Sequence, residues 1–341
     1  MKCVYDERQR RHAPAGFMVS GAWQDSPETP ERADIFSQTL RDAGHEILLP
    51  TDTGRDAIEA VHSVRFVDFL EGIHSRWQRI PDASAQASPN VHPVARDGEA
   101  AGGYPRSAVG QVGFHVYDSA APIGADTFLS AYWSAQTAIR ATDLVLGGEP
   151  VAYALCRPPG HHASREMAGG FCFFNNAAIA AERLRTAHKR VAVVDIDVHH
   201  GNGTQQIFYG RADVLTISLH ADPERFYPFF WGYADETGSG EGKGYNLNLP
   251  LDRGSGDVVY REAFSAAMLR LRQFEPGALV VALGLDAHES DPFKGLALTT
   301  GAFQALAREI AALGCPTLVV QEGGYANPAL GTNLDAFLSG F

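Results

Sequence analysis

Four short polar segments hold the residues whose types and spacing could do chemistry in this chain. The first, Asp195-Ile196-Asp197-Val198-His199, overlaps the end of the apolar run Val191–Ile196. Strand alternation would put Asp195, Asp197 and His199 on one face, where two carboxylates and an imidazole suit a divalent metal ion. A buried salt-bridge cluster is the alternative, but it would leave two neighbouring carboxylates repelling each other. The spacing therefore favours a metal site.

The second segment, Gly284–Pro292, offers a further carboxylate, Asp286. This carboxylate is placed to complete a three-ligand site with the second aspartate and the histidine of the first segment, leaving an open position for water. Taken alone, Asp286 would be better interpreted as the N-cap of a helix. We interpret His288 and Asp291, which follow it, as loop residues.

The third and fourth segments carry groups that could move protons or donate hydrogen bonds. Arg157–His162 reads Arg-Pro-Pro-Gly-His-His, a rigid turn with two adjacent histidines. Beside a metal, His161 and His162 are best interpreted as proton-transfer groups. In Glu322–Tyr325 two glycines permit φ > 0 and a close backbone approach, so Tyr325 could reach over the site. In isolation, that segment would indicate only a turn with a packed ring.

The elements that must position these segments follow from hydrophobic patterning. The strands that we predict are Val151–Cys156, Val191–Ile196, Val214–Leu219, Leu279–Leu283 and Thr317–Gln321. The helices between them are predicted at about Thr127–Leu146, Asn176–Ala187, Val258–Gln273, Ala302–Leu313 and Asn327–Leu338. Such alternation indicates right-handed crossovers and an α/β fold with a mostly parallel central sheet and helices on both faces. All four polar segments then lie at the carboxyl ends of strands, where open parallel sheets bind ligands.

The first third of the chain fits the same plan. Lys2–Asp6 is predicted as a strand. A helix then begins with Thr29 as its N-cap and Pro30 at its first position, and Gly44 ends it. A further helix is predicted to begin after Ser63.

Two long stretches lack sustained periodicity. Residues 81–107 are rich in Ala, Ser, Gly and Pro and are predicted to form a long inserted loop. Residues 221–244 hold six aromatic side chains and are predicted to pack against the protein. Because neither stretch marks a boundary, residues 1–341 are predicted to form a single domain.

The composition indicates which kinds of molecule the chain can bind. The chain has 28 Lys and Arg against 40 Asp and Glu, a net charge of −12. This balance argues against nucleic acid and mildly favours a cationic ligand, although many proteins are acidic simply for solubility. No run of 18 apolar residues and no signal peptide is found, so no membrane partner is expected. The four cysteines form no Cys-x-x-Cys pair, which favours a reduced, cytoplasmic location.

Together the motifs carry a family resemblance. The segments are RPPGHHA (157–163), GGFCFFNN (169–176), DIDVHHGNGTQ (195–205), SLHADP (218–223), GLDAHESDP (284–292) and EGGY (322–325). In this order they resemble the arginase–deacetylase superfamily, and specifically its zinc-dependent histone-deacetylase-like amidohydrolases. The resemblance implies a single-domain arginase/deacetylase fold and hydrolysis of an acetyl amide by a metal-activated water.

Within that family the chain is most similar to the acetylpolyamine amidohydrolases. The features shared with them are the stretch 232–238 and the long loop at about 81–107, which in relatives helps to build a dimer interface that narrows the entrance. The resemblance therefore implies a homodimer that acts on small acetylated amines, such as acetylputrescine, acetylcadaverine and acetylspermidine.

The resemblance also implies a role for each site residue. It places Zn²⁺ on Asp197, His199 and Asp286, a ligand set that suits Fe²⁺ as well. It makes His162 the general base and then the general acid, with His161 beside it. The remaining implied roles are Asp195 holding His161, Asn202 holding His162, and Tyr325 donating to the oxyanion. A structural K⁺ is implied near Asp195, Asp197, His199, Ser218 and Leu219.

For the substrate channel, the resemblance points to Gly170, Phe171 and Tyr227 along the methylene chain, although both rings could equally be core packing. Asp118 is the implied rim carboxylate for a distal ammonium. A second rim carboxylate of relatives is absent, because the corresponding residues are Val109-Gly110-Gln111, and Gly16–Ser26 adds little negative charge beyond Asp25. These departures favour short diamines over long polyamines.

Three other functions compete with this interpretation. A protein-lysine deacetylase would use the same catalytic residues, but the inserted loop argues against it. An arginase-like enzyme with two manganese ions would need more bridging ligands than Val198 and Gly201-Asn202 supply. A non-catalytic sensor of acetylated amines could lose its base or oxyanion donor, whereas His161, His162 and Tyr325 are all present.

Overall fold

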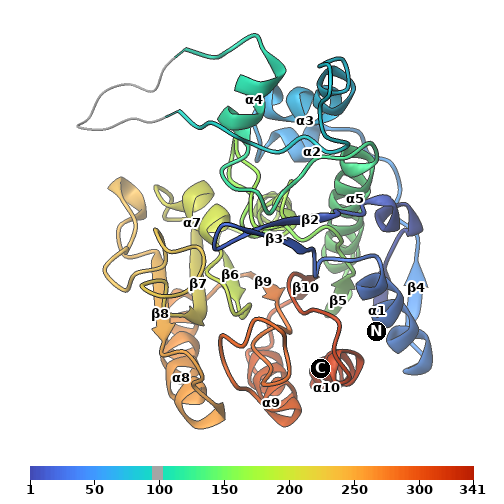
Figure 1. Ribbon diagram of the computed structural model, residues 1–341. Coiled ribbons are helices and arrows are strands. Elements are labelled where there is room, and N and C mark those ends of the chain that lie inside the picture. Colours follow the sequence, from blue (N-terminus) through green and yellow to red (C-terminus); the bar gives the residue numbers. More distant parts are fainter. Residues whose placement is uncertain (94–102) are drawn as a thin grey trace.

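One eight-stranded sheet forms the centre of the protein (Figure 1). The computed structural model describes residues 1–93 and 103–341. The strands lie in the order β4-β1-β5-β10-β9-β6-β7-β8, and every neighbouring pair is parallel. The prediction of an α/β fold with a mostly parallel sheet is therefore confirmed.

The predicted strands lie close to where hydrophobic patterning put them. The sheet strands are β1 Lys2–Val4, β4 Glu46–Leu48, β5 Val151–Ala154, β6 Val191–Asp195, β7 Val214–Ala221, β8 Asn246–Leu251, β9 Ala278–Leu283 and β10 Thr317–Gln321. The two edge strands β4 and β8 were not predicted. Edge strands are short or partly exposed, so they lack the continuous apolar runs that mark the central strands.

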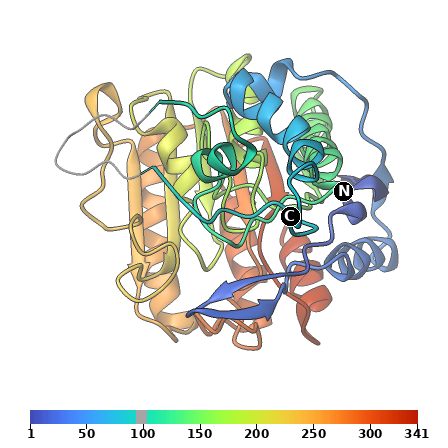
Figure 2. The same cartoon turned by 45° about the horizontal axis from the view of Figure 1, so that its top comes forward.

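Helices cover both faces of the sheet (Figures 1 and 2). They are α1 Glu31–Asp42, α2 Asp56–Glu59, α3 Val64–Trp77, α4 Ala108–His115, α5 Thr127–Leu146, α6 Asn176–Arg185, α7 Asn202–Phe208, α8 Asp257–Phe274, α9 Thr300–Ala311 and α10 Leu330–Leu338, with 3₁₀ turns η1 Glu7–Arg11 and η2 Gly240–Gly242. Alternate strand residues face opposite layers: Val191 and Val193 join the core under α3, α5 and α6. Ala192 and Val194 join the core under α1, α8, α9 and α10.

The two helix starts predicted in the first third differ in outcome. Ser63 caps α3 as predicted, because its side chain accepts a hydrogen bond from the N–H of Phe66. The prediction that Thr29 is the N-cap of α1 is wrong by one residue. Pro30 takes that place with helical dihedral angles, and the buried Thr29 hydroxyl has no hydrogen-bond partner among the described residues.

The two aperiodic stretches are irregular as predicted, with one correction. Residues 94–102 of the predicted loop lie outside the described residues, and its described parts, 81–93 and 103–107, contain no helix or strand. In the stretch 221–244, Phe226 is buried, but Phe229 and Phe230 are 49% and 76% exposed. The prediction that this stretch packs against the protein is therefore wrong at these two side chains and at Tyr233, which is 36% exposed.

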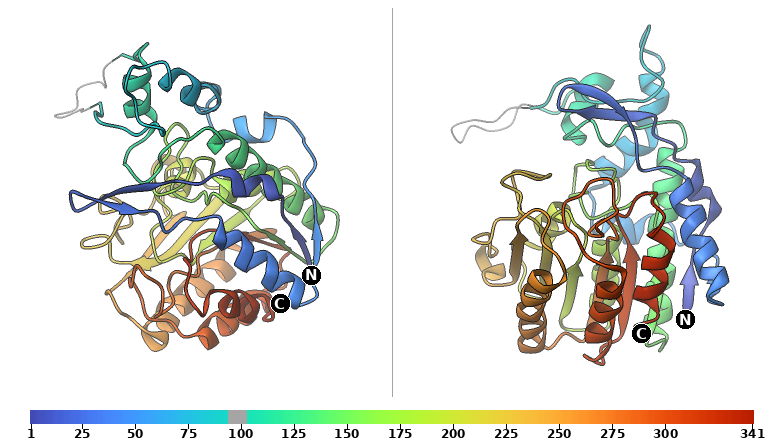
Figure 3. Two further views of the ribbon diagram at one scale, coloured as in Figure 1. Left: turned by 45° about the vertical axis from the view of Figure 1, so that its right-hand side comes forward. Right: turned by 60° about the horizontal axis from the view of Figure 1, so that its bottom comes forward.

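A two-stranded hairpin, β2 Gly16–Val19 and β3 Ala22–Asp25, was not predicted. Its two-residue turn, Ser20-Gly21, has positive φ at both residues, as a type I′ hairpin requires. All of β3 is exposed, so no apolar alternation marks it. Figure 3 shows the hairpin above the end of the sheet from which the polar segments emerge.

Candidate active site

Four neighbouring strands deliver the four polar segments to one place. β5, β10, β9 and β6 are adjacent in the sheet and parallel. β6 ends within its segment, β9 and β10 end immediately before theirs, and β5 ends at Ala154, shortly before Arg157. Their carboxyl ends therefore meet at the middle of one sheet edge, as predicted from the strand pattern.

A buried three-residue group stands at the centre of this edge. One ligand atom each from Asp197, His199 and Asp286 lies within 4.8 Å of the others. The Nδ1 atom of His199 lies 3.1 Å from Oδ1 of Asp197 and 3.4 Å from Oδ2 of Asp286. No helix begins at Asp286, which excludes the N-cap alternative for this residue. The group could hold a metal ion.

The surroundings of this group fit a divalent cation. Burial, followed by the charge of Asp197, raises the pKa of Asp286 to about 6. Oδ1 of Asp286 accepts a hydrogen bond from the N–H of Val198 (2.9 Å), but its buried Oδ2 has no hydrogen-bond partner among the described residues. Gly323 leaves the space open, because a Cβ there would lie 2.1 Å from that oxygen. Two buried carboxylates with an unpartnered oxygen need a positive charge.

The two adjacent histidines each have a buried partner. Nδ1 of His161 lies 2.9 Å from Oδ2 of Asp195, and Nδ1 of His162 lies 2.6 Å from Oδ1 of Asn202. Burial alone would lower the pKa of His161, but the charges of Asp195 and Asp197 outweigh it and raise the pKa to about 10. Burial, then the charge of His161, lowers the pKa of His162. The surroundings therefore shift the pKa values of the two histidines in opposite directions.

The Glu322–Tyr325 turn brings the tyrosine to the site. Two acids for which the sequence suggested no role, one in this turn and one in the Gly284–Pro292 segment, hold the turns in place. Oε2 of Glu322 accepts hydrogen bonds from the N–H groups of Gly160 (2.6 Å) and His161 (3.0 Å), so it fixes the histidine turn. Asp291, interpreted above as a loop residue, is fully buried and accepts from the N–H of Tyr325 (3.1 Å). Burial, then the charge of Asp286, raises the pKa of Asp291 to about 8.

A buried ion-pair network joins these turns to the N-terminal segment. Glu28, Arg32 and Arg157 are each at most 1% exposed. Oε1 of Glu28 lies 2.9 Å from Arg32 and 2.8 Å from Arg157. Arg32 also donates to the carbonyl groups of Glu322 (2.6 Å) and Gly324 (2.5 Å). One carboxylate thus holds the two guanidinium groups that support the histidine turn and the tyrosine turn.

An apolar channel of about 340 Å³ leads to His162, His199 and Tyr325. Its lining includes Phe171 and Tyr227, as predicted for the walls, together with residues of the β2–β3 hairpin. Gly170 also lines it, with φ at +53°, and a Cβ there would lie 2.4 Å from Cδ2 of His162. Only glycine therefore fits at position 170 without displacing that ring.

Asp118 is half-buried and is not among the residues that line the channel. Its carboxylate accepts hydrogen bonds from the N–H of Gly170 (3.0 Å), the N–H of Ala120 (2.9 Å) and the hydroxyl of Tyr227 (2.6 Å). The Tyr227 hydroxyl also lies 3.1 Å from that of Tyr117. Asp118 thus fixes the channel wall, and its predicted role toward an ammonium group stays a prediction.

The residues predicted to hold K⁺ lie on the adjacent strands β6 and β7 and in the turn that follows β6. Asp195 at the end of β6 pairs in register with Ser218 of β7, and Leu219 follows. The N–H groups of Asp197 and His199 donate to the side chains of Asp195 and Asp197, at 3.0 and 2.9 Å. The structure brings these five residues close together in the fold, and the ion stays a prediction.

Comparison with known proteins identifies the class of this fold and site. The family model described as the histone deacetylase domain matches residues 26–341. The chain therefore belongs to the histone deacetylase family and is a hydrolase. Among the residues described, no helix is both long and apolar enough to cross a membrane.

Individual relatives are acetylpolyamine amidohydrolases. That of Burkholderia pseudomallei (strain 1710b) is 44% identical over 342 residues, which cover 100% of this chain and 98% of the relative. Acetylpolyamine amidohydrolase 1 of Pseudomonas aeruginosa is 40% identical over 345 residues, covering 100% and 99%. The resemblance predicted from the sequence is confirmed.

Two solved structures of related proteins have the same fold as this chain. A crystal structure of acetylpolyamine aminohydrolase from Burkholderia pseudomallei superposes with a TM-score of 0.96 at 44% identity, covering 100% of this chain and 98% of that one. The HD domain of HDA15 superposes with a TM-score of 0.81 at 30% identity, covering 99% and 90%. The arginase/deacetylase fold implied by the sequence is therefore confirmed.

Several residues of the site were missed in the sequence. Glu322 and Arg157 were recognised only as parts of motifs. Each is a charged residue followed by two prolines or two glycines, and a charged side chain beside such a turn can be buried if it has a partner of opposite charge or a hydrogen-bond partner. The ion pair of Glu28 and Arg32 could have been predicted from the sequence, because opposite charges four residues apart at the start of a helix commonly pair. Tyr117 gave no sign at all, since its role arises only when distant segments meet.

Proposed function

We propose that this chain is a zinc-dependent amidohydrolase that removes acetyl groups from small acetylated amines of the diamine and polyamine class. The observation that carries the proposal is a single arrangement: Asp197, His199 and Asp286 converge beside His162 and Tyr325 at the end of an apolar channel. The names of the relatives that match the full chain support the same substrate class.

The metal ligands and the two histidines have different roles in the proposed reaction. A zinc ion held by Asp197, His199 and Asp286 supplies Lewis acidity toward the amide carbonyl and acidifies water. Because the Asn202 carbonyl oxygen only accepts, Nδ1 of His162 carries the proton in that 2.6 Å hydrogen bond. Nε2 of neutral His162 is then free to take a proton, as a general base requires.

The leaving amine needs a proton once the C–N bond breaks. His162 can return the proton it has taken, which makes it the general acid of the second step. The ring centroid of His161, which Asp195 holds, lies 4.0 Å from that of His162. Because the charge of a protonated His161 lowers the pKa of His162, it would disfavour prolonged protonation of His162. The histidine pair therefore both accepts the proton and releases it to the product.

Tyr325 is the oxyanion donor of the proposal. Its backbone is held by Asp291, and its ring lies 4.9 Å from the guanidinium of Arg32. Its side chain is 3% exposed and lines the channel. A single buried donor aimed at the developing charge is commonly worth about 3–4 kcal/mol in the transition state.

Acetate release from acetylputrescine, acetylcadaverine and acetylspermidine tests this proposal. The zinc-loaded protein should release acetate from at least one of the three, and a chelated sample should not. A folded chain that binds one zinc ion and releases no acetate from any of them would refute the amidohydrolase proposal. The homodimer, the cytoplasmic location and the K⁺ ion stay predictions.

A further inference from the structure

The role proposed for His162 depends on which way the side-chain amide of Asn202 faces. Nδ1 of His162 lies 2.6 Å from Oδ1 of Asn202. The two ends of an amide have almost the same size, so the group also fits when it is turned round, with Nδ2 toward the ring. Nδ1 of His162 would then accept a hydrogen bond, and Nε2 would carry the proton and could not act as a base. The neighbours of Asn202 therefore decide whether His162 can take a proton.

A chain of polar groups leads away from Asn202 on the side opposite His162. Nδ2 of Asn202 lies 3.5 Å from the hydroxyl oxygen of Tyr117, which lies 3.1 Å from that of Tyr227. The hydroxyl of Tyr227 lies 2.6 Å from Oδ2 of Asp118. Two backbone N–H groups also donate to this carboxylate, at 3.0 and 2.9 Å. The chain therefore ends at a group that accepts hydrogen bonds from every side.

Each hydroxyl has one proton to donate, and this sets the direction of the chain. Tyr227 gives its proton to Asp118, because an ionised carboxylate only accepts. The oxygen of Tyr227 is then an acceptor for the proton of Tyr117, and the carbonyl oxygen of His162, at 3.4 Å, is the more distant alternative. With its proton used in either way, Tyr117 can only accept from Asn202. The amide nitrogen of Asn202 then faces Tyr117, and its oxygen faces His162.

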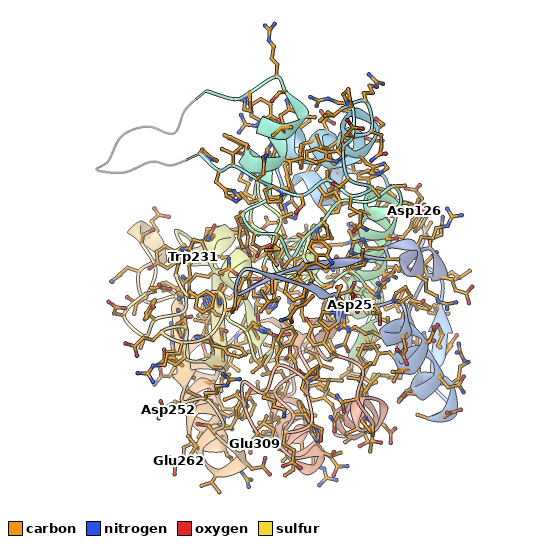
Figure 4. All side chains as sticks on the ribbon, in the orientation of Figure 1. Asp25, Asp126, Trp231, Asp252, Glu262 and Glu309 are labelled. Carbon is orange, nitrogen blue, oxygen red and sulfur yellow. The ribbon has the colours of Figure 1, made fainter. Side chains whose placement is uncertain are left out.

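Two contacts hold the ring of Tyr117 in this position. A Cβ at Gly169 would lie 2.1 Å from Cζ of Tyr117, so only glycine lets the ring come this close. Trp231, labelled in Figure 4, packs edge-on against the ring, with 6.2 Å between the centroids. Tyr117 is not among the described residues that line the channel. An influence of Tyr117 on the reaction therefore passes through Asn202 rather than through contact with the substrate.

We propose that Tyr117 is a positioning residue that keeps Oδ1 of Asn202 toward His162 and thereby keeps the proton of this ring on Nδ1. The inference rests on the proposed function, in which Nε2 of His162 takes a proton. It gives Asp118 a role that does not depend on the distal end of the substrate, because the carboxylate sets the direction of the chain through Tyr227.

The expected effect is a change in the tautomer of His162. A net hydrogen bond shifts the equilibrium between two orientations roughly two- to tenfold. Tyr117→Phe offers neither end of the amide a partner, so the fraction of His162 rings with a proton on Nδ1 should fall from above about nine tenths to about half. Because only these rings have a free Nε2, kcat should fall about twofold, while KM should change little.

An aspartate at position 202 separates this role from a general effect on the fold. A carboxylate has two oxygens that both accept, so it keeps a proton on Nδ1 of His162 in either orientation. Adding Tyr117→Phe to Asn202→Asp should therefore leave the Nδ1 fraction unchanged. Tyr227→Phe is a second test, because it removes the nearest acceptor of the Tyr117 proton and lets Tyr117 donate to a turned amide. This variant should also lower the Nδ1 fraction.

The measurement is the nitrogen NMR spectrum of labelled histidine rings in the zinc-loaded protein, which shows which ring nitrogen carries the proton. The loss of signals in His162→Gln identifies those of His162. Tyr132→Phe on α5 is the matched control, because it removes a tyrosine hydroxyl that donates to Asp52 and does not belong to the described channel lining. It should give the wild-type fraction. On the same samples, kcat and KM are measured with acetylputrescine.

Three results would overturn the role of Tyr117. They are a wild-type proton on Nε2 of His162, an unchanged Nδ1 fraction in Tyr117→Phe, and an equal loss of that fraction when Asn202→Asp is present. If Tyr117→Phe does not fold, an unchanged fraction in Tyr227→Phe overturns the role instead. A wild type with the expected tautomer that releases no acetate from acetylputrescine, acetylcadaverine or acetylspermidine overturns the proposed function and leaves the role of Tyr117 in place.

Discussion

Replacing Glu28 by Gln should destabilise the protein and disturb both turns of the site. The carboxylate is fully buried between Arg32 and Arg157, with oxygen–nitrogen distances of 2.9 and 2.8 Å. Glutamine would leave two buried guanidinium groups without a counter-charge. Removing one partner of a buried pair costs about 3–5 kcal/mol. Gln keeps the shape of the side chain, so the change tests charge rather than packing.

The expected decrease in Tm follows from this loss in the free energy of unfolding. An unfolding entropy of about 2.1 cal/mol/K per residue gives roughly 0.7 kcal/mol/K for 341 residues. A loss of about 3–5 kcal/mol therefore lowers Tm by about 4–7 °C. Because Arg32 holds the carbonyl groups of Glu322 and Gly324, kcat should also fall, since Tyr325 directly follows them.

The pH dependence has a definite sign. Burial opposes ionisation of Glu28, but the charges of Arg157 and Arg32 outweigh it and lower its pKa below the ordinary value. A depressed carboxyl pKa contributes stability that is fully present above the unfolded value, about pH 4.3, and is lost as pH falls through the folded value. The Tm difference between wild type and Glu28→Gln should therefore be constant near neutral pH and shrink in acid.

The assay is thermal unfolding of both proteins between pH 3 and pH 8. Glu31→Gln, an exposed change at the start of α1, is the matched control and should leave Tm within about 1 °C. A Glu28→Gln protein that melts within about 1 °C of the wild type at pH 7 would refute the reasoning. So would a Tm difference that grows toward acid pH.

The remaining predictions concern the site. Tyr325→Phe should lower kcat on acetylputrescine by about 10²- to 10³-fold with Tm little changed, because it removes the proposed oxyanion donor; near-normal turnover would contradict that role. Asp286→Ala should lower the zinc content after dialysis, measured by elemental analysis, since it removes one of three buried ligands. Gly170→Ala should lower kcat/KM at least about tenfold, because its Cβ would lie 2.4 Å from His162 and its φ is +53°.

Two matched variants control these experiments. Glu289→Gln changes an exposed acid three residues from Asp286 and should leave the zinc content unchanged. Gly72→Ala lies inside α3, where a Cβ would meet nothing within 4 Å, and should keep activity and raise stability by about 0.5–1 kcal/mol. Equal loss in a variant and its control would indicate a general effect of substitution rather than the site.

The central sheet and the group of Asp197, His199 and Asp286 could be predicted because both depend on local patterns. Val191–Asp195 is apolar on both faces, which only a buried parallel strand requires. The alternation that follows it places Asp197 and His199 together regardless of the rest of the fold. Four such segments could then be assigned to one sheet edge, since the carboxyl ends of parallel strands lie on the same side.

The channel could not be predicted in the same way, because its walls come from segments without regular patterns. Asp118 gives no sign in the sequence that its carboxylate turns inward to Tyr227 and Gly170. Phe229 is as apolar as Phe226, yet it is exposed, because only the latter reaches the ring of His199. Such outcomes depend on tertiary contacts between residues that are up to 109 positions apart in the sequence.

The proposed substrate class is tested most directly by kcat/KM of the zinc-loaded protein, measured side by side on small acetylated amines and on an acetyl-lysine peptide. Acetylputrescine, acetylcadaverine and acetylspermidine would stand for the small substrates. We expect at least one of them to exceed the peptide clearly, because an apolar channel of about 340 Å³ suits a slender amine. Peptide turnover equal to or better than that of every small amine would contradict the proposal and identify a protein-lysine deacetylase instead.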